Sequence, residues 1–194
     1  MEQAEFSTQN SLQLIESMIN KAQNRFNENG HLYLLWGWVI FICSIVHFVV
    51  DYWDIYENPQ FVWFATWGAV IYQMIYLART KKKERVKTYT DEIIGHVWIV
   101  FVISMGLIGF VAGKFGAWGL MYPLFLILYG TPTFLSGAII KFPPLQIGAV
   151  GCWILAIAST FVINQYQVLF LALAVLSAWI IPGYLLRSRF KKQN

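Results

Sequence analysis

The chain has 194 residues, of which 58% are aliphatic, aromatic or Cys and only 12% are Asp, Glu, Lys or Arg. Soluble domains carry about 25% charged residues, so this composition excludes an ordinary water-soluble domain and predicts an integral membrane protein. The formal net charge of +4 does not indicate a nucleic-acid partner, because the basic residues flank apolar segments, as topology signals do.

The N-terminal segment 1–28 is predicted to form a cytoplasmic amphipathic helix. Over residues 8–28, apolar side chains recur at alternating spacings of three and four. They are Leu12, Ile15, Ile19, Ala22 and Phe26. We expect this helix to lie on the headgroups or beneath the bundle; the alternative is homo-oligomer contact or docking of a cytoplasmic protein partner. Residues 1–30 have no apolar signal-peptide core, so the first spanning helix is expected to direct insertion.

Intervals without charged residues predict the membrane-spanning helices, because a bilayer core about 30 Å thick needs about 20 apolar residues. The interval 142–186 would extend about 68 Å as one helix, so it must turn back at the polar run 164–167. The sequence thus predicts an all-α polytopic bundle of six transmembrane helices within 29–187, followed by a cytoplasmic tail, 188–194. The expected spans are about 31–51, 59–78, 93–113, 118–140, 144–163 and 167–186.

The distribution of basic residues predicts the orientation of these six spans. Thirteen of the 14 Lys and Arg residues fall on the side that holds both termini, and only Lys114 falls on the other. The positive-inside rule then predicts a cell-membrane protein with a cytoplasmic N-terminus and a cytoplasmic C-terminus.

The loop between the second and third spans is strongly basic. It contains Lys81, Lys82, Lys83, Arg85 and Lys87. Each basic residue near an anionic leaflet contributes about 1 kcal/mol of attraction. The simplest interpretation is a loop that sets topology; the alternative is contact with the membrane surface and its anionic phospholipids.

Small residues at helical spacing predict close helix packing, because they let membrane helices approach each other. Packing within one chain is expected, and a dimer interface is the alternative. The stripes are Gly148, Cys152, Ala156 and Thr160 in the fifth span, Gly109 and Gly113 in the third, and Ala174 and Ala178 in the sixth.

One polar group stands out within the spans. Cys43, His47 and Asp51 are four residues apart, so they share one face of the first helix. The simplest interpretation is a helix-end histidine paired with Asp51, which lowers the cost of burying the imidazole. The alternative is a metal, haem or polar-ligand site. Cys152, the second cysteine, is interpreted as a small buried residue.

The other two histidines, His31 and His96, open the first and third spans. They are interpreted as interface residues; if the two helices are neighbours, a bis-His metal or haem site is the alternative. No catalytic motif is visible in the sequence, and no cofactor is predicted.

Span four contains Pro132, which is predicted to kink the helix. With Gln73, the neighbouring Thr131, Thr133 and Ser136 would line a path in a small oligomeric transporter or channel. The expected function is a non-enzymatic role in sensing, scaffolding or complex assembly. Transport is the first alternative, and a membrane metal, haem or redox protein is the second.

The junction at 27–38, with the sequence Asn-Glu-Asn-Gly-His-Leu-Tyr-Leu-Leu-Trp-Gly-Trp, follows the helix 16–26. It resembles a group of uncharacterised bacterial six-helix inner-membrane proteins. The resemblance implies a bacterial cytoplasmic membrane and brings no activity, cofactor or catalytic residue.

Overall fold

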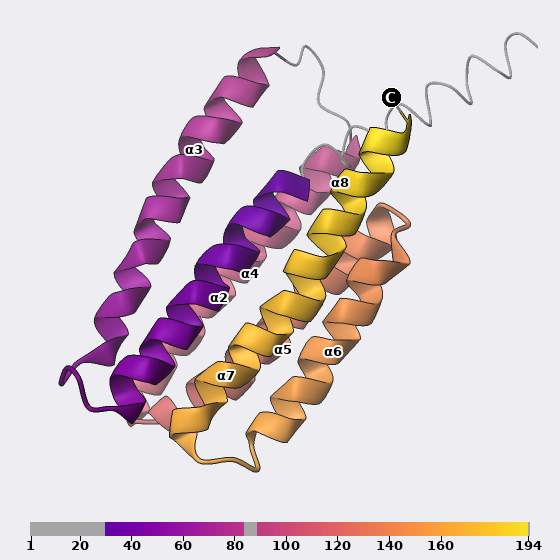
Figure 1. Ribbon diagram of the computed structural model, residues 1–194. Helices are drawn as coiled ribbons and strands as arrows, with labels where there is room; N and C mark the ends of the chain where they lie inside the picture. The colour runs from indigo at the N-terminus through magenta and orange to yellow at the C-terminus, as the bar shows by residue number, and fades with distance from the viewer. Residues whose placement is uncertain (1–29, 84–88, 194) are drawn as a thin grey trace, which may run out of the picture.

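The computed structural model describes residues 30–83 and 89–193, and all regular structure in these two ranges is helical (Figure 1). Successive long helical segments run antiparallel, and α7, η3 and α8 together form one of these segments. In order they are α2 (Gly30–Tyr52), the 3-10 helix η1 (Pro59–Phe64), α3 (Ala65–Lys83), α4 (Tyr89–Phe115), the 3-10 helix η2 (Trp118–Leu120), α5 (Met121–Ile139), α6 (Pro143–Ser159), α7 (Asn164–Val175), the π-helix η3 (Leu176–Ile180) and α8 (Ile181–Gln193).

Five helical segments are long and apolar enough to cross a membrane, which suggests a membrane location. They are Gly30–Tyr52, Pro59–Arg79, Glu92–Phe115, Trp118–Ile139 and Asn164–Arg189. The sixth apolar helix, α6, has 17 residues and is shorter than the roughly 20 that span a bilayer. All regular structure in the described residues is helical, as predicted, and five of the six predicted spans are helices long and apolar enough to cross a membrane.

The helix α6 is shorter than the predicted fifth span because it ends early. The expected span extended to residue 163, but the helix ends at Ser159. The Ser159 hydroxyl donates to the carbonyl of Ala156, and the Thr160 hydroxyl donates to that of Ile157, both over 2.7 Å. These hydroxyls satisfy carbonyls of the last turn, and residues 160–163 then form the connection to α7.

Two predictions fall wholly or partly outside the described residues. The amphipathic N-terminal helix lies in 1–29, which the structure does not describe. Of the basic loop, Lys81, Lys82 and Lys83 belong to the backbone of α3, and Arg85 and Lys87 lie outside the described ranges. Both predictions therefore stay predictions.

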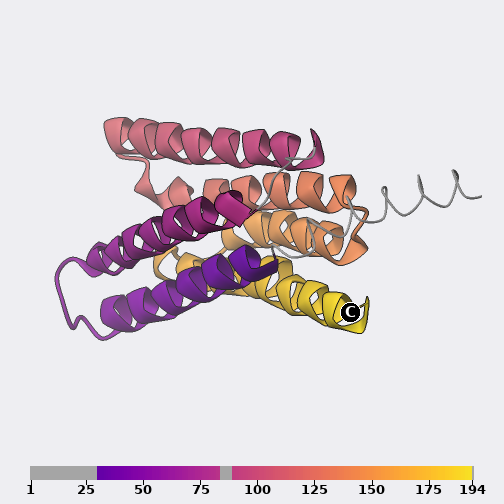
Figure 2. The same cartoon turned by 90° about the horizontal axis from the view of Figure 1, so that it is seen from above.

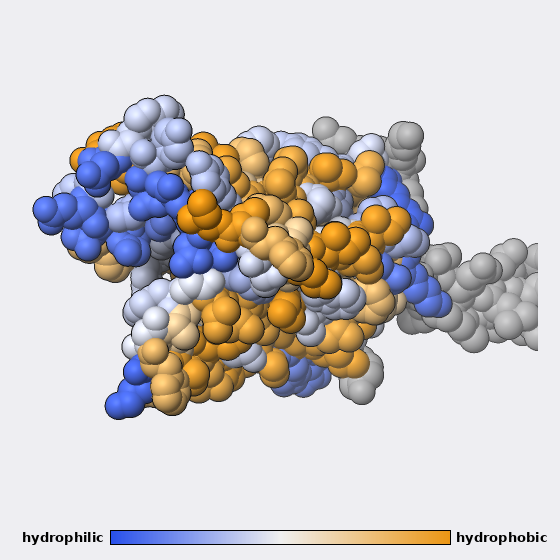
Figure 3. All heavy atoms as spheres, turned by 90° about the horizontal axis from the view of Figure 1, so that it is seen from below, coloured by the Kyte–Doolittle hydropathy of each residue, from blue (hydrophilic) through white to orange (hydrophobic). Residues whose placement is uncertain are grey.

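The alternating helices define two ends of the bundle (Figures 1 and 2). We call the end with the turns 53–58, 116–117 and 160–163 the Asp51 end; the opposite end carries the C-terminal residues of α8. Seen from the Asp51 end, hydrophilic residues gather over the turn between α2 and η1, and apolar residues cover much of the remaining view (Figure 3). Lys114, in the last turn of α4, is at this end.

An aromatic cluster forms the centre of the core. The rings of Tyr129 and Trp179 stack with centroids 4.7 Å apart, and Trp98 meets Trp179 edge-on at 5.9 Å. The indole N–H of Trp179 donates to the Thr133 hydroxyl over 2.8 Å. This cluster joins α4, α5 and η3 in the core of the bundle.

The last long helix contains a wide turn before its proline. Pro182 has no N–H to complete the normal α-helical hydrogen bond, and residues 176–180 just before it adopt π-helical geometry. Trp179, a member of the aromatic cluster, lies within this π-turn. The helix near Pro182 thus contains a local π-turn and continues through it.

Small residues produce close packing in α6 and in the last helix, as predicted. A Cβ built on Gly148 would lie 2.6 Å from the Cα of Ala178, and Cys152 and Ala156 are buried along the same stripe. Thr160, the fourth predicted member, is exposed.

In α4 the described residues show little of the expected packing within the chain. A Cβ on Gly109 would meet no atom of the described chain within 4 Å, and one on Gly113 would meet only the ring of Trp118. This stripe faces away from the other helices because α4 packs through a different face, which includes Trp98 and Phe101.

The helices α3 and α4 lie at the periphery. Figure 1 shows α3 set off from the rest of the bundle. It is attached to α2 by side chains: Tyr72 bonds to His31, and Trp36 donates its indole N–H to Gln73. Most residues of both helices are exposed, whereas more than half of the last long helix is buried.

Candidate functional site

His47 is the best-positioned polar side chain near the Asp51 end. It projects from α2 and is 8% exposed. Its Nδ1 accepts a hydrogen bond from the indole N–H of Trp63 in η1 over 3.1 Å. Its Nε2 lies 3.3 Å from the hydroxyl of Tyr122, in the first turn of α5. One imidazole therefore connects three separate segments of the chain.

These two contacts assign the tautomer of His47. An indole nitrogen can only donate, so Nδ1 of His47 must be the acceptor and carries no proton. The neutral imidazole then carries its proton on Nε2, which donates to the Tyr122 oxygen. Both nitrogens are engaged by protein groups. A metal ion would have to displace Trp63 or Tyr122 to reach one of them.

Asp51 and Cys43 have other partners than the sequence interpretation expected. The backbone carbonyl of Asp51 accepts from the side-chain amide of Gln165 in α7 over 3.2 Å. The thiol of Cys43 is directed to the carbonyl of Val62 at 3.7 Å. Cys43 and His47 thus both point toward η1, but their hydrogen bonds go to different residues, and neither goes to the Asp51 carboxylate.

The remaining histidines have separate partners. His31 bonds through Nε2 to the Tyr72 hydroxyl over 3.0 Å and lies against the ring of Tyr76. His96 bonds through Nδ1 to the carbonyl of Glu92, one turn earlier in its own helix. Across 30–83 and 89–193, no group of three or more His, Cys, Asp or Glu side chains is arranged to hold a metal ion. The bis-His hypothesis gains no support from these contacts.

The polar residues suggested for a transport path have separate partners and different burial in the described chain. Thr131 is exposed and bonds to the carbonyl of Ile127, whereas Thr133 and Ser136 are fully buried on the other side of α5. Gln73 bonds to Trp36, at the contact between α2 and α3. The helix continues through Pro132. The hydroxyl of Thr133 donates to the carbonyl of Tyr129 over 2.7 Å.

Sequence reasoning found His47 but missed Trp63 and Tyr122, its two partners. Both residues stand within about one turn of the start of an apolar segment, where aromatic residues are common at a membrane interface. That position could have suggested them as candidates. Comparisons with protein families, with curated proteins and with solved structures found no match for this chain.

Proposed function

We propose that this chain is a non-enzymatic membrane protein that acts in complex assembly, and that its first partner is a second copy of itself. The open glycine face of α4 carries this proposal. Around that face the described chain leaves room for another helix, which is what an assembly surface in a membrane requires.

Four glycines form this face: Gly95, Gly106, Gly109 and Gly113. At about 100° per residue they fall within an arc of about 60° on the helix. A Cβ on any of the first three would meet no atom of the described chain within 4 Å. A purely lipid-facing surface has no need of glycine, which costs about 1 kcal/mol relative to Ala in a helix interior.

The geometry of a glycine face favours a second copy as its occupant. Glycine on both helices allows the closest approach of two backbones, and a two-fold axis places identical faces against each other. The exposed side chains of Val102 and Phe110 lie on or beside the glycines and would pack across such an interface.

The proposed molecule spans the membrane six times, with α6 as its shortest span, and has both termini in the cytoplasm. Antiparallel helices support this topology by bringing Arg79, Lys141 and Arg187 to the end opposite Lys114. In this orientation the basic segment 81–87 meets the anionic phospholipids of the cytoplasmic leaflet.

The test is the oligomeric state in a bilayer. The protein is reconstituted at low density in liposomes, and subunits are counted by single-molecule photobleaching of a C-terminal fluorescent label. We expect dimers for the wild type and monomers for the double variant Gly106→Leu/Gly109→Leu. Open space around both glycines means that leucine fits the monomer, so loss of dimers would reflect the interface and not unfolding.

The matched control is Ala138→Leu, which enlarges an exposed small residue on α5. It is expected to leave the dimer intact. A monomeric wild type would contradict the proposal, and so would a dimer that persists in the double leucine variant.

A further inference from the structure

The helix α3 is joined to α2 by side-chain hydrogen bonds in the half of the bundle away from the Asp51 end. His31 bonds to Tyr72, and Trp36 donates its indole N–H to Gln73. The rest of α3 is largely exposed. A peripheral helix held in this way can turn about its attached half when its other end is released.

At the Asp51 end the contact with α2 is made by η1, the short helix that leads into α3. Trp63 of η1 donates to Nδ1 of His47, and its half-buried ring packs against the core. The carbonyl of Val62 lies 3.7 Å from the Cys43 thiol, which is a weak donor. The Trp63–His47 contact is therefore the stronger of these two polar links.

The Trp63–His47 hydrogen bond requires a neutral imidazole. An indole N–H cannot accept, so it bonds to Nδ1 only while that nitrogen carries a lone pair. When a proton binds to Nδ1, two N–H groups face each other and the link is lost. The contact with Tyr122 survives, because a phenol oxygen accepts from Nε2–H in either state. Protonation therefore breaks the bond to η1 and keeps the bond to α5.

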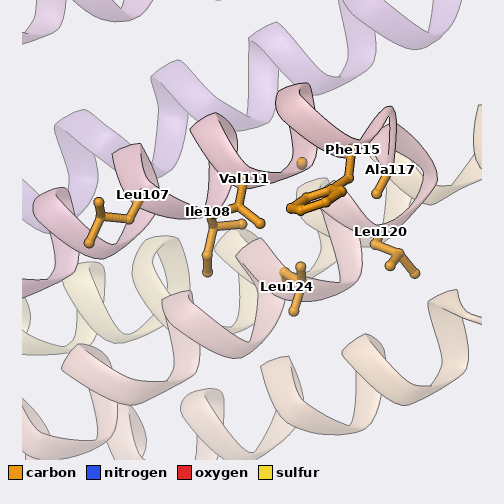
Figure 4. Close-up of a pocket in the computed structure, with 8 residues that line it drawn as sticks. Leu107, Ile108, Val111, Phe115, Ala117, Leu120 and Leu124 are labelled. Atoms are coloured by element: carbon orange, nitrogen blue, oxygen red, sulfur yellow. The ribbon is translucent and has the colours of Figure 1, made fainter.

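Few charged or titratable groups surround His47. Its own helix provides Asp51 and Cys43, each one turn away, and α5 provides Tyr122. η1 has no titratable residue, and Tyr166 is the only one in α7. The nearby groove between α4 and α5 is lined by apolar side chains (Figure 4). The other charged residues at the Asp51 end are Asp54, Glu57 and Lys114.

Asp51 provides the opposite charge that an imidazolium needs. Residues four apart lie on one face of a helix, so its carboxylate is within reach of the His47 ring once Trp63 has moved. The hydrogen bond from Gln165 uses the backbone carbonyl of Asp51 and does not compete for the carboxylate. The carboxylate therefore favours the protonated histidine in the released state.

The proton comes from water at the Asp51 end. His47 is 8% exposed, and residues 52–58, just beyond its helix turn, are exposed. A buried imidazolium opposite an N–H donor is costly, so the proton binds more tightly once η1 has moved away. A ligand that binds one state more tightly shifts the population toward that state.

We propose that His47 is a pH-sensitive switch: uptake of one proton breaks its bond to Trp63 and releases η1, with the adjoining half of α3, from α2. The helix α3 then turns about its bonds at Tyr72 and Gln73. In the orientation proposed above, the Asp51 end faces the outside, so the switch responds to external acid. It is separate from the proposed dimer, whose interface lies on α4.

The experiment measures the distance between η1 and the α6–α7 turn by double electron–electron resonance. Nitroxide labels are attached at neutral pH to the exposed positions Gln60→Cys and Thr160→Cys, while the native cysteines are buried. The full chain is placed in nanodiscs, one chain per disc, so both faces meet the buffer. We expect one distance at about pH 7.5 and an additional, longer one at about pH 5. Uptake of one proton raises the ratio of longer to shorter distances by up to about tenfold per pH unit.

Two variants test the roles of the residues. His47→Asn keeps an acceptor near the position of Nδ1 and cannot be protonated, so it is expected to keep the shorter distance at both pH values. Asp51→Asn removes the opposite charge, so the midpoint of the response is expected to move to lower pH. The matched control is His96→Asn, whose histidine bonds within α4, and it should respond like the wild type.

A wild-type distance that does not change with pH would overturn the proposal, and so would an acid response that persists in His47→Asn. Asp51→Asn lies at the end of α2 and keeps the backbone carbonyl that accepts from Gln165, so it tests the switch even if the His47 variant does not fold. An unchanged midpoint in Asp51→Asn would contradict the proposed pairing. Subunit counting, which tests the dimer, is a separate measurement.

Discussion

The indole N–H of Trp63 donates to Nδ1 of His47 across 3.1 Å, and this contact decides what the histidine can do. In the sequence His47 resembles a metal ligand. In the structure this hydrogen bond makes it a link between α2 and η1. With Tyr122 on the other nitrogen, the link extends to α5. His47 in this state holds helix ends together near the Asp51 end of the bundle.

Nitrogen NMR of labelled histidine tests the Trp63–His47 contact directly. The wild type is expected to show His47 as a single neutral tautomer with the proton on Nε2. Trp63→Phe keeps an aromatic ring but removes the donor, so a mixture of tautomers is expected, with a loss of about 0.5–1.5 kcal/mol in the free energy of unfolding. Trp38→Phe, which removes an exposed hydrogen bond to Tyr184, is the control and should leave His47 unchanged. A wild-type His47 protonated on Nδ1 would contradict the assignment.

The crossing of α6 and η3 predicts a steric effect at Gly148. A Cβ there would lie 2.6 Å from both the Ala178 Cα and the Ser177 carbonyl oxygen, and neither backbone atom can rotate away. Gly148→Ala is therefore expected to lower the free energy of unfolding by about 1–3 kcal/mol. Gly68→Ala in α3 is the control, because its Cβ meets nothing within 4 Å of the described chain and alanine favours a helix. Equal free energies of unfolding for the two variants, measured in detergent solution, would refute the close crossing of α6 and η3.

The Trp179–Thr133 hydrogen bond predicts a measurable energetic coupling. Trp179→Phe keeps the stack on Tyr129 but loses the bond, and Thr133→Val removes the other partner; each is expected to cost about 1 kcal/mol or more. In a double-mutant cycle the two losses should not add, because the same bond is removed twice. Strict additivity of the two substitutions would show that the bond does not stabilise the bundle. Trp67→Phe, at an exposed position on α3, should be close to neutral.

The sequence predicted what depends on local pattern and missed what depends on which helices are neighbours. Charge-free intervals located the apolar helices, and the spacing of four residues placed Cys43 and His47 on one buried face of α2. The early end of α6 depends on hydroxyl bonds at Ser159 and Thr160, which hydropathy does not detect. The partners of His47 lie 16 and 75 residues away, so only the packing of α2 with η1 and α5 identifies them.

The same limit applies to the small-residue stripes. Gly148 in α6 and Gly109 in α4 follow identical spacing rules, yet one meets the backbone of η3 and the other faces open space. Spacing shows that a helix face permits close approach. It does not show whether the approaching helix belongs to the same chain.

Thiol labelling tests the orientation inferred from the basic residues. Asn58→Cys lies in the turn of the Asp51 end, and Ser188→Cys lies in α8 at the opposite end; both positions are exposed. The native Cys43 and Cys152 are 3% and 0% exposed, so they should react little and leave a low background. A membrane-impermeant thiol reagent added to intact cells is expected to label Asn58→Cys only, because the positive-inside rule puts α8 in the cytoplasm. After permeabilisation both variants should react. Labelling of Ser188→Cys in intact cells would reverse the inferred orientation.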